Sequence, residues 1–137
     1  MSNLENRLSF YKFLPAIVWF LVVFFIMCLP GKVIPKVAWL NDIYFDKWIH
    51  AGLFGLLTLL FCLPFHKSPF ASSHRLYYFI KIAIAASLWG LAIEFIQKYL
   101  ITGRTFDLLD WAADSFGCFV AFLIARKFFK TSKSPGL

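Results

Sequence analysis

Polar and ionisable side chains recur near one end of three long apolar segments, and their types are suited to proton transfer or to binding a charged head group. They are Asp46, His50, Glu94, Gln97, Arg104, Asp107, Asp110 and Asp114. The four-residue spacings from Asp46 to His50 and from Asp110 to Asp114 are each one helical turn. A histidine beside carboxylates can act as a general acid or base, and a guanidinium group suits phosphate or carboxylate. We therefore predict that these eight residues form a ligand-binding site, with His50, Glu94 and Asp110 as its catalytic candidates.

The segments that must position these residues are unusually apolar. The 137-residue chain is 61% hydrophobic and 15% charged, whereas soluble domains contain about 45–50% apolar and about 25% charged residues. A short soluble domain cannot bury that much apolar surface. This composition excludes an ordinary soluble enzyme and favours an integral membrane protein.

Four apolar runs are long enough to cross a bilayer as helices. They cover about residues 13–30, 48–65, 76–100 and 108–129. The runs do not alternate as barrel strands would, and helices satisfy their own backbone groups in lipid. We expect an all-α bundle of four transmembrane helices over residues 1–130, with residues 131–137 as a mobile cytoplasmic tail.

The net charge of +7 is distributed unevenly between the two ends of such a bundle. Eight lysines and arginines, against Glu5 alone, lie in the N-terminal segment, the second connection and the C-terminal segment. The positive-inside rule then places both termini in the cytoplasm. The basic charge is an orientation signal and a means of contacting membrane lipids, so we predict no nucleic-acid partner.

Small residues share helical faces with the acids. Ser87 and Gly90 lie on the Glu94 face of the third segment, and Gly117 lies on the Asp114 face of the fourth. Such stripes let helices approach closely in lipid. The acids should therefore face the bundle interior or a cleft at its mouth, and the first helix, which has no such stripe, should be peripheral.

Several carboxylates at one depth would repel one another. Either Arg104, His50 or a cation must lie among them, or one carboxyl group must be protonated. The alternative is purely structural, with these groups pairing to lock helix ends and with Asp107 or Asp110 as an N-cap. One histidine among carboxylates is weak evidence for a metal ion, so we predict no metal or cofactor.

The order of these residues resembles the VanZ-like family over about residues 46–126. The resemblance lies in D-K-x-x-H with Phe54, then E-x-x-Q, then G-R-x-F-D-x-x-D-x-x-A-D-x-x-G from Gly103 to Gly117. It departs at Asp114, where the family usually has asparagine. The resemblance implies a small protein of the bacterial cytoplasmic membrane and cell envelope, in a family linked to resistance to the glycopeptide teicoplanin.

We predict an outward-facing pocket that binds a lipid-linked envelope precursor, another head group or a glycopeptide. Arg104 would contact the anion, and Asp110 would orient His50 or Arg104. Whether the protein is an enzyme stays open, because no zinc-protease motif, nucleophile elbow or ATP-binding loop is present. The alternatives are a membrane enzyme acting on lipid head groups, a transporter or proton relay, and a structural or partner-binding subunit.

Overall fold

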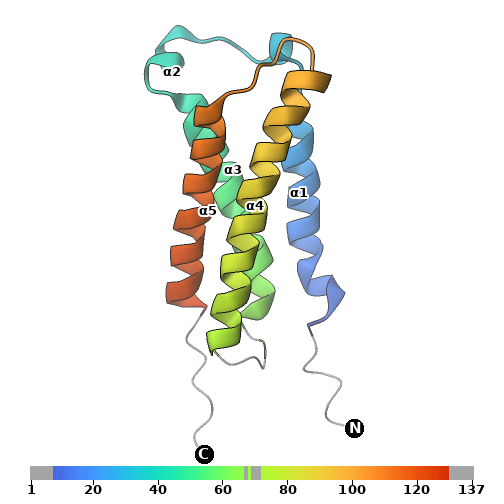
Figure 1. Ribbon diagram of the computed structural model, residues 1–137, viewed down its shortest axis with the longest axis vertical. Coiled ribbons are helices and arrows are strands. Elements are labelled where there is room, and N and C mark those ends of the chain that lie inside the picture. Colours follow the sequence, from blue (N-terminus) through green and yellow to red (C-terminus); the bar gives the residue numbers. More distant parts are fainter. Residues whose placement is uncertain (1–7, 67, 69–71, 130–137) are drawn as a thin grey trace, which may run out of the picture.

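The computed structural model describes residues 8–66, 68 and 72–129, and within them every regular element is helical. Figure 1 shows four long helices side by side, with short elements at their ends. The elements are η1 (Phe10–Phe13), α1 (Leu14–Met27), η2 (Gly31–Val33), α2 (Ala38–Asp42), α3 (Phe45–Cys62), η3 (Leu63–Phe65), α4 (Ser72–Leu100) and α5 (Leu108–Phe128). Four helical stretches are long and apolar enough to span a membrane: Phe10–Met27, Phe45–Phe65, Ser73–Leu100 and Leu108–Phe128.

The helix boundaries differ from the predicted ones by a few residues. The first helix ends at Met27 and not at residue 30, since Pro30 disfavours helical backbone in the residue before it. The α3 helix begins at Phe45 and α4 at Ser72, both earlier than predicted, because polar residues extend these helices beyond their apolar runs. The α2 helix lies in the connection between α1 and α3. The predicted mobile tail, residues 131–137, lies outside the described residues.

Glycines bring α3 and α5 into close contact. A Cβ atom added to Gly117 would overlap the backbone carbonyl of Ala51, and one added to Gly55 would lie 3.2 Å from the carbonyl oxygen of Gly117. This contact confirms that the predicted small-residue face of α5 allows close helix approach. It also fixes the depth at which the first turns of α3 and α5 meet.

The α1 helix lies at one side of the bundle, against α3 and α4 (Figure 1). Only Ala16, Val23 and Met27 of α1 are buried, and Trp19 Nε1 donates a hydrogen bond to the carbonyl of Leu53. This agrees with the peripheral position predicted for it.

The two ends of the bundle are formed by different segments of the chain. At one end Leu8 and Phe129 pack in the same apolar cluster, and the buried Arg75 donates to the carbonyls of His66 and Phe129. At the other end the Gly31 N–H donates to the Thr102 carbonyl, so the α1–α2 and α4–α5 connections touch there. The first and last described residues therefore share one end, as an even number of helical passes requires.

Candidate functional site

The end that holds the α4–α5 connection also holds a group of charged side chains. We call it the polar cluster, and it consists of Asp46, Lys47, His50, Glu94, Asp107, Asp110 and Asp114. The first two turns of α3, the last two turns of α4, and the N-cap and first two turns of α5 supply these residues. The three helices thus place their ionisable groups at one depth, where the sequence pattern predicted them.

His50 and Asp114 form the buried centre of the polar cluster. His50 Nδ1 lies 2.9 Å from Asp114 Oδ1, and the two residues are 5% and 0% exposed. Gly90 on α4 makes room for this pair, because a Cβ atom there would lie 2.6 Å from Asp114 Oδ2. The sequence predicted that Asp110 would orient His50 or Arg104. In the structure Asp114 makes the close contact with His50, and Asp110 Oδ2 lies 3.7 Å from His50 Nε2.

Lys47 supplies the positive charge that the carboxylates need. Its Nζ atom lies 2.5 Å from Asp110 Oδ1, 2.6 Å from Asp107 Oδ2 and 2.9 Å from Asp46 Oδ2. Lys47 was absent from the predicted site, although it lies three residues before His50 and so on the same helical face. That spacing was the signal that could have identified it.

Asp107 joins all three helices of the polar cluster. It is the N-cap of α5, where its Oδ1 accepts from the Leu109 N–H at 2.8 Å, so one of the two predicted caps is confirmed. Its own N–H donates to Glu94 Oε2 at 2.8 Å. The Lys47 ammonium bonded to Asp107 lowers the pKa of its carboxyl group, and the backbone N–H of Leu109 acts in the same direction.

Glu94 is fully buried, and its two carboxylate oxygens differ in their hydrogen bonding. Oε2 accepts the Asp107 N–H, whereas Oε1 has no hydrogen-bond partner among the described residues. One carboxylate oxygen of Glu94, one of Asp110 and a ring nitrogen of His50 all lie within 4.8 Å of one another. This nitrogen and oxygen set is of the kind that can hold a metal ion.

Gln97 and Arg104 lie to one side of the polar cluster and contact α1. Gln97 Nε2 and Arg104 Nη2 donate to the same carbonyl, that of Met27, at 2.8 and 3.3 Å. Arg104 makes no ion pair within the described part of the chain, and its buried Nε atom has no hydrogen-bond partner there. Lys47, and not Arg104, therefore pairs with the acids among the described residues.

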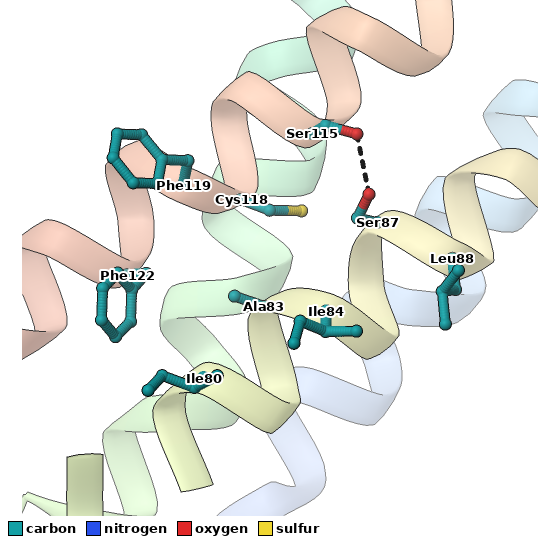
Figure 2. A pocket seen from close by; sticks show the side chains of 9 residues that line it. All are labelled: Ile80, Ala83, Ile84, Ser87, Leu88, Ser115, Cys118, Phe119 and Phe122. Carbon is teal, nitrogen blue, oxygen red and sulfur yellow. Dashed lines mark hydrogen bonds between the residues drawn. The ribbon is translucent and has the colours of Figure 1, made fainter. Parts of the chain in front are cut away.

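A separate apolar groove runs between α4 and α5 (Figure 2). Ser87 and Ser115 bond to each other at 2.7 Å at its edge, and the other lining side chains are hydrocarbon or thiol groups. No residue of the polar cluster lines it. The groove therefore adds no charged group to the site.

Comparison with known proteins leaves the family open. No family model matches the chain, and no solved structure matches it. The chain is 38% identical over 79 residues to an uncharacterized protein of Schizosaccharomyces pombe. The matched region is 58% of this chain and 45% of that protein, so the chain spans less than half of this relative's length. The comparison relates this chain to a fungal protein and assigns it no activity.

Proposed function

We propose that this protein is a multi-pass integral membrane protein with both termini in the cytoplasm and the polar cluster at the opposite face. Four helical stretches of spanning length support the insertion, and the excess of lysine and arginine near the termini supports the orientation. Reporter fusions at each terminus and in the 101–107 connection test this topology. A terminal reporter that is active only outside the cytoplasm would overturn it.

We propose that the end of the bundle that holds the polar cluster binds the phosphate or carboxylate of a membrane-linked head group, with Arg104 as the anion contact. The observation that carries this proposal is that Arg104 makes no ion pair with any described residue, and that its buried Nε atom has no hydrogen-bond partner among them. A guanidinium group with free donors binds phosphate through paired, charge-assisted hydrogen bonds.

Titration of the purified protein with a short-chain phosphatidic acid, and with the matching phosphatidylcholine, tests this proposal. We expect tighter binding of phosphatidic acid and roughly a tenfold or greater loss in Arg104→Ala, since a hydrogen bond to a charged group contributes about 1.5–3 kcal/mol. Lys32→Ala is the matched control, because Lys32 lies in η2 at the same end. Equal affinity of wild type and Arg104→Ala would disprove the role of Arg104.

A second candidate function is that of a membrane enzyme acting on lipid head groups. The His50–Asp114 pair favours it, because a carboxylate on Nδ1 orients the ring and leaves Nε2 as the proton-transfer atom. Release of phosphate or of a free head group from a lipid substrate, lost in His50→Ala, would support it. A folded wild-type protein inactive on a panel of phospholipids and lipid-linked sugars would favour binding alone.

The VanZ-like assignment, the location in a bacterial cytoplasmic membrane and the link to teicoplanin resistance stay predictions within this proposal. The sequence order from Asp46 to Gly117 supports them, whereas the relative found by comparison is fungal. Expression in a susceptible bacterium, with Arg104→Ala and His50→Ala as comparisons, tests the resistance. An unchanged teicoplanin susceptibility on expression of the wild type would remove that part of the proposal.

A further inference from the structure

We propose that His50, Glu94 and Asp110 bind a divalent transition-metal ion, with His50 Nε2 and one oxygen of each carboxylate as ligands. The sequence alone is only weak evidence for a metal ion, because it places one histidine among the carboxylates at this end of the bundle. The tertiary structure brings a ring nitrogen of His50 and one carboxylate oxygen each of Glu94 and Asp110 within 4.8 Å of one another. This inference goes beyond head-group binding, because a metal ion can bind whether or not a lipid does.

The histidine is prepared for metal ligation by Asp114. The Asp114 carboxylate lies 2.9 Å from His50 Nδ1, so that nitrogen carries the proton and Nε2 keeps its lone pair. Metal-bound histidines characteristically donate their second ring N–H to a carboxylate in this way. Asp114 therefore acts as a positioning residue for the ligand His50.

Asp110 divides its two oxygens between a lysine and the proposed metal site. Oδ1 lies against Lys47 Nζ, while Oδ2 lies 3.7 Å from His50 Nε2. Two ligand atoms bonded to one Zn²⁺ at about 2.1 Å with a tetrahedral angle lie about 3.4 Å apart. The His50–Asp110 separation is close to this value, and small side-chain rotations would bring it there.

Glu94 supplies independent evidence that this site can bind a cation. Its side chain is 0% exposed, yet Oε1 has no hydrogen-bond partner in the described residues. A buried carboxylate oxygen without a partner is costly unless a proton, a donor or a metal ion compensates it. The polar cluster holds five carboxylates against the single ammonium of Lys47, so its charge also favours a cation.

Three protein ligands leave at least one coordination position open. Catalytic zinc sites use this arrangement, in which the open position accepts water or a substrate oxygen. A phosphate oxygen could take that position, since the proposed anion contact Arg104 lies at the same end of the bundle. The metal would then neutralise the carboxylates that otherwise repel an anionic head group.

The test measures metal content on the purified full-length chain. After equilibration with Zn²⁺ and removal of free ion, we expect about one bound Zn²⁺ per chain by plasma mass spectrometry, because the geometry offers one three-ligand site. We expect roughly a tenfold or greater loss in Glu94→Gln and in His50→Ala, since each removes a ligand. Asp46→Asn is the matched control, because it removes a carboxylate of the polar cluster whose side chain is 58% exposed and bonds only Lys47.

Several outcomes would overturn the proposal. They are no stoichiometric Zn²⁺ on wild type, equal retention in Glu94→Gln, or equal loss in Asp46→Asn. X-ray absorption of Zn²⁺-loaded wild type gives a check that needs no variant, and a spectrum without imidazole scattering would also exclude the site. Arg104→Ala should keep its Zn²⁺ while losing the anionic lipid, so the failure of one proposal is distinguishable from the failure of the other.

Discussion

Asp114 Oδ1 lies 2.9 Å from His50 Nδ1, and this contact joins α5 to α3 in the buried centre of the polar cluster. A carboxylate or an amide at position 114 would offer an oxygen that can accept from the Nδ1–H. The carboxylate differs by its charge, which favours a cation bound at Nε2. The His50–Asp114 pair therefore contributes both to the stability of the bundle and to the cation binding proposed at the polar cluster.

Replacing Asp114 should distinguish its hydrogen bond from its charge. Asp114→Ala leaves His50 buried without its partner, and we expect a loss of about 3 kcal/mol in the free energy of unfolding. Asp114→Asn keeps an acceptor for Nδ1–H, so we expect a loss of about 1 kcal/mol. Denaturant unfolding in detergent micelles measures both, and equal losses would show that the acceptor contributes nothing.

Removing Lys47 should leave the carboxylates of Asp46, Asp107 and Asp110 without their shared cation. We expect Lys47→Met to destabilise the protein by about 2–4 kcal/mol, because it breaks a partly buried ionic network from one side. Lys36→Met is the control, since Lys36 is exposed in the α1–α2 connection. Equal unfolding midpoints for the two variants would contradict the central role of Lys47.

Asp107 should make stability fall in acid. Its pKa is lowered by Lys47 in the folded state, so its contribution is complete above the unfolded value of about 3.9 and is lost as the pH falls through the lower folded value. Asp107→Asn should abolish this part of the acid dependence while it keeps the N-cap acceptor. Thermal unfolding of wild type and variant between pH 3 and 6 measures it, and parallel curves would refute the assignment.

A second substitution of Asp107 should isolate the contribution of the N-cap to stability. Asp107→Ala loses the acceptor of the Leu109 N–H as well as the charge. We expect it to be less stable than Asp107→Asn by about 1 kcal/mol at neutral pH. Unfolding in denaturant at pH 7 compares the two, and an alanine variant as stable as the asparagine variant would show that the cap is dispensable.

A methyl group added at Gly117 should not fit between α3 and α5. Gly117→Ala would place Cβ against the backbone carbonyl of Ala51, so the helices must separate, at an expected cost of about 1–3 kcal/mol. Gly52→Ala is the matched control, because a Cβ there meets nothing within 4 Å and alanine is the better helix former. We expect Gly52→Ala to be neutral or stabilising by up to about 1 kcal/mol, and a reversed order of the two variants would contradict this packing.

The sequence by itself determined the four apolar helices and the depth of the charged residues along them. Backbone groups in an apolar run must pair locally, so run length and composition are enough to predict such helices. The spacing of Asp110 from Asp114 and the small-residue stripes also gave the inward faces. Helix ends were less predictable, because polar residues extend α3 and α4 past their apolar runs.

Only the tertiary structure decided which cationic side chain contacts the carboxylates. Arg104 and Lys47 are both cations at the polar end, but Lys47 contacts the carboxylates while Arg104 donates to the carbonyl of Met27. The spacing of residues along one helix determines which face of the helix a side chain is on. The residue that it contacts depends on the distance and the crossing angle between that helix and its neighbours. The close approach of α3 and α5 at Gly55 and Gly117 is part of what positions His50 beside Asp114.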